Sequence, residues 1–205
     1  MILLDYSQIA LSNIMVQKLN DEDMIRHMIL NSIRMYNKRY RKEYGQMVIC
    51  ADGMNTWRRQ YFPEYKANRK KGRDATSHMD WPEIFRILST VREELMENFP
   101  YKVLHMEDAT FITEGASQTP LRQTRVDDWL THSDDLKGHM PEEIYRNYQR
   151  NKTLIDLNEI PETIQESIIS KYDGQKLPMR MKVLNYLIKK RCTNLIECVE
   201  EFYNA

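Results

Sequence analysis

Two short apolar segments near the start of the chain each end in an aspartate, and they restrict the possible folds more than any other feature. Residues 1–4 (MILL) lead to Asp5, and residues 47–51 (MVICA) lead to Asp52. Between them, residues 21–44 carry apolar side chains at helical spacing. We therefore expect strand, helix and strand in this order. This is the crossover unit of a parallel sheet, in which both aspartates lie at the carboxyl edge.

The segment that follows extends this pattern. Residues 57–68 predict a short helix interrupted near Pro63. Residues 81–98 predict a longer amphipathic helix with Asp80 as its cap, and residues 101–106 alternate in polarity and predict a third strand. The first part of the chain is therefore expected to be an α/β unit.

The character of the sequence changes after residue 106. Residues 107–120 are polar and aperiodic, and the chain beyond them offers helical patterns but no convincing buried strand. We expect an α/β domain over residues 1–108 and an all-helical C-terminal lobe over residues 109–205. The helices predicted in this lobe lie near residues 124–137, 141–150, 161–172, 179–191 and 194–203.

The composition indicates the class of protein but not its function. Thirty basic and thirty acidic residues cancel, and no apolar run approaches the ~18 residues that a membrane span requires. The start of the chain has no basic leader, so we expect a cytosolic protein without a membrane role. The three cysteines and five histidines show no metal-ligand spacing.

Asp5 and Asp52 allow two interpretations. Each can cap the turn or helix that follows its strand. Alternatively, because neighbouring strands lie about 4.8 Å apart, the two carboxylates can face a single site. A pair of carboxylates repels unless a cation lies between them, and Mg²⁺ prefers oxygen ligands, so this second interpretation predicts a metal site.

Residues 58–73 concentrate positive charge in a chain whose net charge is zero. Seven cations oppose only Glu64, which gives a local net charge of +6. If this segment is helical, Arg59, Lys66 and Arg69 fall near one face and Tyr65 lies beside them. Such a face suits phosphates and bases, whereas the alternative is a solvated charged loop.

Several motifs resemble the 5′-nuclease (flap endonuclease) family, and most closely its ribonuclease H members from T-even-type bacteriophages. ILLDYSQIALS, VICADG and WRRQYFPEYKANRKK resemble the nuclease domain, while FITEGASQTPLR, YQRNKTLIDLNEIP and KLPMRMKVLNYLIKK resemble the small C-terminal lobe. The resemblance implies a 5′-nuclease (PIN-like) α/β domain with an abbreviated parallel sheet, followed by the helical lobe.

The resemblance also implies roles for individual residues. Asp5 and Asp52 would be the first members of an acidic cluster that holds Mg²⁺ or Mn²⁺. Lys66 and Arg69 would act on the scissile phosphate, and Tyr65 would stack on a terminal base. The expected nucleic-acid-binding residues of the helical gateway are Arg58, Arg59, Tyr65, Lys66, Arg69 and Lys70.

The chain departs from the family pattern after its third strand. The family's Glu-Ala-Asp-Asp and Ser-x-Asp-x-Asp motifs and its helix-turn-helix are absent, because HMEDA runs directly into TFITEG. A long internal segment is therefore expected to be missing. The only acidic residues at the junction are Glu107 and Asp108, and the loss of a strand would leave an exposed sheet edge.

Two functions therefore remain open. The first is a metal-dependent 5′ to 3′ nuclease that removes RNA primers or short 5′ flaps during phage DNA replication in the host cytoplasm. The second is a catalytically inactive nucleic-acid-binding remnant of the family. The resemblance implies RNA·DNA and 5′-flap DNA as substrates or ligands, and replication-fork proteins such as a sliding clamp or a single-strand-binding protein as partners.

Overall fold

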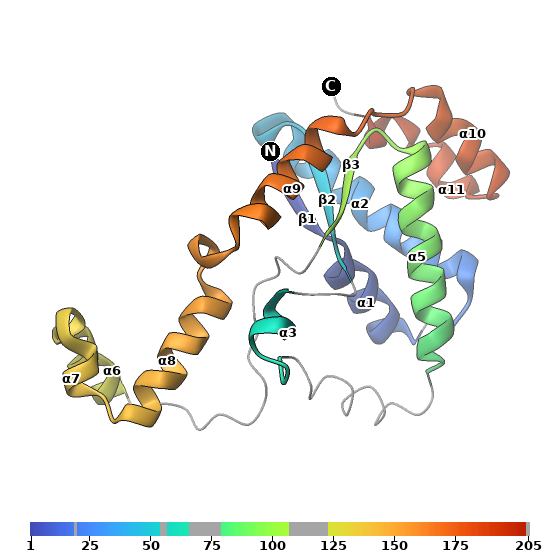
Figure 1. Ribbon diagram of the computed structural model, residues 1–205. Coiled ribbons are helices and arrows are strands. Elements are labelled where there is room, and N and C mark those ends of the chain that lie inside the picture. Colours follow the sequence, from blue (N-terminus) through green and yellow to red (C-terminus); the bar gives the residue numbers. More distant parts are fainter. Residues whose placement is uncertain (19, 54–56, 66–78, 107–122, 204–205) are drawn as a thin grey trace.

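A computed structural model describes residues 1–18, 20–53, 57–65, 79–106 and 123–203 of the chain. It contains a parallel sheet of three strands in the order β1-β2-β3 (Figure 1). The strands are β1 (Ile2–Asp5), β2 (Met47–Asp52) and β3 (Lys102–Met106). The predicted strand, helix and strand pattern and the third strand are thereby confirmed.

The crossover from β1 to β2 contains two helices rather than one. A first helix, α1 (Tyr6–Gln17), precedes the expected α2 (Glu22–Tyr44). Asp21 begins α2 by accepting the Met24 amide at 2.8 Å, and Gly45 follows its end with φ of 77°, a conformation that glycine adopts without strain. The ends of α2 therefore agree with the predicted range of residues 21–44.

Beyond β2 the chain forms α3 (Trp57–Tyr61) and α5 (Trp81–Asn98) before it returns to β3. Asp80 caps α5 by accepting the Glu83 amide at 3.1 Å, as the sequence predicted. The predicted helix over residues 57–68 is shorter in the structure, and its part from residue 66 lies outside the described residues.

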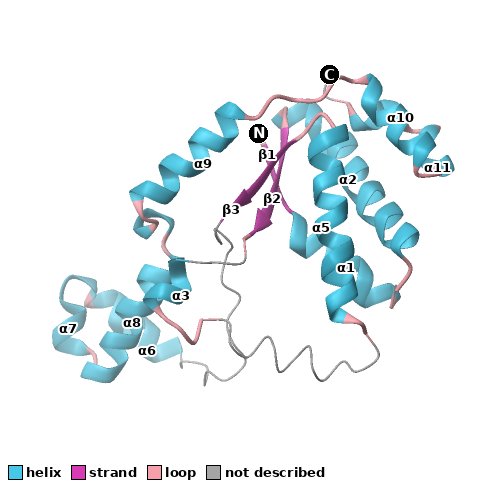
Figure 2. Cartoon of the chain, turned by 45° about the vertical axis from the view of Figure 1, so that its right-hand side comes forward, coloured by secondary structure: helices cyan, strands magenta, loops and turns pink. Residues whose placement is uncertain are grey.

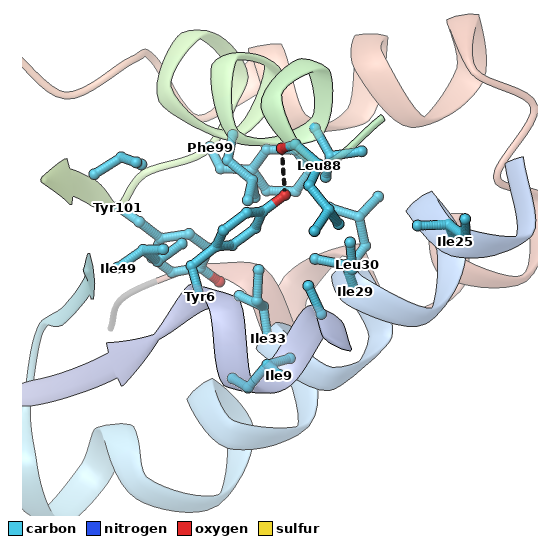
Figure 3. Packing of buried hydrophobic residues seen from close by; sticks show 14 of the residues in the cluster. Tyr6, Ile9, Ile25, Ile29, Leu30, Ile33, Ile49, Leu88, Phe99 and Tyr101 are labelled. Carbon is cyan, nitrogen blue, oxygen red and sulfur yellow. Dashed lines mark hydrogen bonds between the residues drawn. The ribbon is translucent and has the colours of Figure 1, made fainter. Parts of the chain in front are cut away.

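The core lies between one face of the sheet and helices α1, α2 and α5 (Figure 2). Ile49 of β2, Ile29 of α2 and Leu88 of α5 belong to one apolar cluster, and Figure 3 shows labelled members of this cluster around Tyr6. The Tyr6 hydroxyl donates to the Leu88 carbonyl oxygen at 2.7 Å, so that the one polar atom of this ring is satisfied within the core (Figure 3).

The described residues after 122 are helical, as expected. Their C-terminal part packs on the α/β core, because Val183, Leu187 and Phe202 belong to the same apolar cluster. By contrast, α6, α7 and α8 extend away from the sheet (Figure 1). The helices are α6 (Gln123–Thr131), α7 (Leu136–His139), α8 (Glu142–Ile155), α9 (Glu162–Gly174), α10 (Met181–Lys189) and α11 (Thr193–Ile196), with 3-10 turns η1 (Ser133–Asp135), η2 (Leu157–Glu159) and η3 (Val199–Phe202).

The predicted domain boundary near residue 108 stays a prediction. A strict separation at this point would divide the common core, since the helices near the C-terminus complete the packing of the first part of the chain.

The outer edge of β3 is covered by the segment that contains α9. The Gln175 side-chain oxygen accepts the backbone N–H of Val103 at 2.9 Å, and the Lys102 ammonium lies 4.1 Å from the centre of the Tyr172 ring. These contacts satisfy edge groups that a neighbouring strand would otherwise pair. The edge of β3 is therefore less exposed than we expected from the loss of a neighbouring strand.

Candidate metal and nucleic-acid site

The two aspartates predicted as metal ligands lie at the carboxyl edge of the sheet. Asp5 is the last residue of β1 and Asp52 is the last residue of β2. Asp5 also caps α1, because its Oδ1 accepts the Gln8 amide at 2.9 Å. A carboxylate has a second oxygen and several lone pairs, so capping and metal binding are compatible for this side chain.

Both aspartates lie on the same face of the sheet. Asp5 pairs with Cys50, and Asp52 follows Cys50 by two residues, so alternation places all three side chains on one face. From this register the two Cα atoms are about 8 Å apart, one strand across and two residues along. Carboxylates at this separation can converge on one ion between them.

The pKa of the Cys50 thiol is affected by both carboxylates. Burial raises the pKa of this thiol, and the negative charges of Asp5 and Asp52 raise it further. The two carboxylates therefore share one electrostatic environment. Because the thiol stays protonated at neutral pH, it adds no third negative charge to the pair.

The donor set formed by Asp5 and Asp52 fits one hard divalent cation. Mg²⁺ is commonly held by one or two carboxylates and completes its shell with water and substrate oxygens. Within the described ranges, no group of three or more His, Cys, Asp or Glu side chains is arranged to hold a metal. Glu107 and Asp108 lie outside these ranges.

The structure reveals one contact to Asp52 that the sequence did not indicate. The imidazole of His105, on β3, forms a hydrogen bond with the backbone of Asp52. On its other side, Nε2 of His105 lies 3.3 Å from Nη1 of Arg92. The only signal in the sequence was the position of His105, one residue before the end of the predicted third strand.

Two of the predicted nucleic-acid-binding residues, Arg58 and Tyr65, are buried in the structure. Arg58 is 1% exposed, its Nε donates to the Leu154 carbonyl oxygen at 2.8 Å, and its guanidinium lies 4.7 Å from the centre of the Trp57 ring. Tyr65 is 5% exposed. Arg58 therefore ties α3 to α8, and the expected contacts of Arg58 and Tyr65 with nucleic acid stay predictions that require these side chains to become accessible.

The remaining residues of the basic segment divide into two groups. Arg59 is exposed on α3, directly after the strand end that carries Asp52. Lys66, Arg69 and Lys70 lie outside the described residues. Within the described residues, the predicted nucleic-acid-binding cations are therefore those of α3. The roles assigned to Lys66, Arg69 and Lys70 stay predictions.

A parallel sheet with carboxylates at its carboxyl edge and a helical C-terminal region defines an abbreviated PIN-like α/β nuclease fold. The comparisons agree with this class. The family model described as "T4 RNase H, C terminal" matches residues 101–202. Ribonuclease H of Enterobacteria phage T4 is 25% identical over 290 residues, covering 98% of this chain and 95% of that protein. The chain is thus similar to this phage ribonuclease H over nearly its whole length.

The alignment with the phage protein also confirms that this chain is internally shortened. It extends over 290 aligned positions, whereas the chain has 205 residues, so at least 85 of those positions lack a residue here. The match nevertheless reaches nearly the full length of both proteins. The missing positions therefore lie largely within the chain rather than at its ends.

Proposed function

We propose that this protein is a metal-dependent 5′ to 3′ nuclease that removes RNA primers or short 5′ flaps during phage DNA replication. The observation that carries the proposal is the placement of Asp5 and Asp52 on one face at the carboxyl edge of the sheet, beside the same thiol. Its relation to a phage ribonuclease H supports the class of reaction.

The residues have separate roles in this proposal. Asp5 and Asp52 hold the cation, Mg²⁺ or Mn²⁺, which when bound supplies Lewis-acid activation of water and offsets the charge of the phosphate. Lys66 and Arg69 bind the scissile phosphodiester and stabilise the charge that develops as water adds to it. Arg59 contacts the phosphate backbone and holds the 5′ strand in register.

The proposed substrates are RNA·DNA duplexes and 5′-flap DNA, and the proposed setting is the replication fork in the host cytoplasm. A sliding clamp or a single-strand-binding protein would bring the protein to this substrate. No described helix is long and apolar enough to cross a bilayer.

A second function is favoured by one specific observation. The described residues offer two carboxylates but no third metal ligand, and binding two metal ions close together requires several negative ligands to offset their repulsion. The alternative is therefore a protein that binds branched nucleic acid through its cations without cleaving it.

A cleavage assay separates the two functions. The full chain is incubated with a 5′-labelled flap substrate and an RNA·DNA duplex, with Mg²⁺ or with a chelator. We expect Mg²⁺-dependent release of label, and a loss of at least about 100-fold in Asp5→Asn and Asp52→Asn. Asparagine caps a helix as well as aspartate does, so Asp5→Asn removes the charge while keeping the start of α1.

Asp134→Asn serves as the matched control, because Asp134 is exposed on η1, outside the proposed site. Activity equal to the unaltered protein in both strand-end variants would refute the nuclease proposal. Absence of cleavage at every Mg²⁺ and Mn²⁺ concentration, together with flap binding that weakens with salt at a log–log slope of about −0.9 per phosphate contact, would establish the binding alternative.

A further inference from the structure

The end of β2 is tied to the rest of the molecule by a chain of polar contacts. His105 lies on β3, where it pairs with Ala51, the neighbour of Asp52. Its imidazole contacts the backbone of Asp52 on one side and Nη1 of Arg92 on the other, the latter at 3.3 Å. The contacts thus connect α5 through β3 to the last residue of β2.

The chemistry of the three groups fixes the direction of the hydrogen bonds. Arginine only donates, so Nε2 of His105 accepts from Arg92 and the neutral ring carries its proton on Nδ1. That N–H is then the donor to the backbone carbonyl of Asp52.

Arg92 is itself held in place. Its Nη2 donates to the Ser89 hydroxyl at 3.0 Å within α5, and the same nitrogen lies 3.8 Å from a carboxylate oxygen of Glu93. Its side chain is 20% exposed. The guanidinium therefore approaches His105 from a defined direction and does not move as a free surface cation.

The end of a strand needs such support more than its middle. Asp52 is the last residue of β2, and it pairs with Met106, the last residue of β3. A metal ligand requires positional precision of about 0.5 Å, which hydrogen bonds to its surroundings normally provide. Asp5 obtains comparable support from its cap on α1.

We propose that His105 is a positioning residue that, held by Arg92, fixes the end of β2 and thereby orients the Asp52 carboxylate toward the cation shared with Asp5. The part of this inference that concerns the cation rests on the proposed function. The part that concerns the strand end does not, and it is measured without metal.

Hydrogen exchange of the metal-free full-length protein tests the tether. In His105→Ala we expect the amides at the end of β2, through Gly53, to exchange about fivefold faster, because one restraining hydrogen bond is lost. His105→Gln, which keeps one donor and one acceptor, should restore most of the protection. His139→Ala is the matched control, since His139 is an exposed histidine on α7.

Mn²⁺ titration followed by electron paramagnetic resonance tests the consequence for the site. We expect about 3- to 10-fold weaker Mn²⁺ binding in His105→Ala, near-normal binding in His105→Gln, and unchanged binding in His139→Ala. Unfolding by urea should give similar midpoints for the three variants. A comparable midpoint excludes global destabilisation as the cause.

The outcomes are distinct. Unchanged exchange at the end of β2 in His105→Ala overturns the inference, and so does faster exchange with unaltered Mn²⁺ affinity. If the unaltered chain binds no Mn²⁺, the proposed metal function fails, while the exchange data still decide whether His105 holds the strand end. Faster exchange with weaker Mn²⁺ binding, both rescued by glutamine, supports the inference.

Discussion

Replacing Glu94 with alanine should destabilise the protein strongly, because this carboxylate joins three helices through a largely buried network. Its side chain on α5 is 13% exposed and accepts from Nε of Arg26 on α2 at 2.9 Å. It also accepts from the hydroxyl of Tyr186, on α10, at 2.7 Å and from the ammonium of Lys190, the residue after α10, at 2.5 Å. Removing it therefore leaves three donors without their acceptor.

The loss in free energy of unfolding depends on how far the former partners of Glu94 can find other acceptors. Removing one member of a buried ion pair costs about 3–5 kcal/mol. Arg26 is 1% exposed but also contacts Glu22 and Asp23, and Lys190 can turn toward water, so part of the loss is recovered. We therefore expect a decrease of about 2–3 kcal/mol in the free energy of unfolding, which corresponds to about 5–10 °C in melting temperature for a chain of this size.

Urea unfolding at pH 7, followed by circular dichroism, measures this change. Glu93→Ala is the matched control, because Glu93 is the preceding residue of α5 and its side chain is 61% exposed, and it should cost less than about 0.5 kcal/mol. A loss in Glu94→Ala no larger than that of the control would refute the reasoning that the network holds α10 on the core.

The pH dependence provides a second check on Glu94. Burial acts to raise the pKa of its carboxyl group, but hydrogen bonds from Lys190, Tyr186 and Arg26 outweigh burial and lower the pKa below 4.5. A carboxyl group with a lowered pKa stabilises the folded state above its unfolded pKa, and this contribution is lost as the pH falls through the folded value. The difference between the unaltered protein and Glu94→Ala should therefore shrink below about pH 4.5.

Two further predictions concern the core and the site. Tyr6→Phe should lower the free energy of unfolding by about 1–2 kcal/mol, measured by urea unfolding, because the buried hydrogen bond from its hydroxyl to a carbonyl of α5 is lost; a neutral result would mean that this hydrogen bond contributes no net stability. Cys50 should react slowly with a thiol reagent at pH 8 and faster in Asp5→Asn or Asp52→Asn, since either change removes a charge that raises the thiol pKa. Reaction rates in both variants equal to that of the unaltered protein would mean that the carboxylates do not affect the thiol.

The boundaries of the main elements could be predicted because they depend on local signals. Asp21 and Asp80 cap their helices through amides three residues ahead, so the sequence alone contains both partners. The helix over residues 6–17 was not predicted. Its apolar residues are spread around the helix rather than gathered in one stripe, and Asp5 was considered chiefly as the end of a strand.

The residues around the site show the limit of such signals. The resemblance assigned Arg58 to nucleic acid, and the structure places its guanidinium against a carbonyl 96 residues away in the sequence. Gln175 covers the edge of β3 from a distance of 72 residues. No periodicity or motif encodes these partners, because they meet only once the helices have packed.

The sequence by itself determined the parallel crossover, the strand-end aspartates and the resemblance to the 5′-nuclease family, since apolar periodicity and short motifs are properties of contiguous residues. Only the tertiary structure decided that Asp5 and Asp52 lie beside one thiol, that His105 contacts the backbone of Asp52, and that α10 completes the core. The physical reason is that burial and the register between strands set the electrostatics of each side chain, and both arise from contacts between distant parts of the chain.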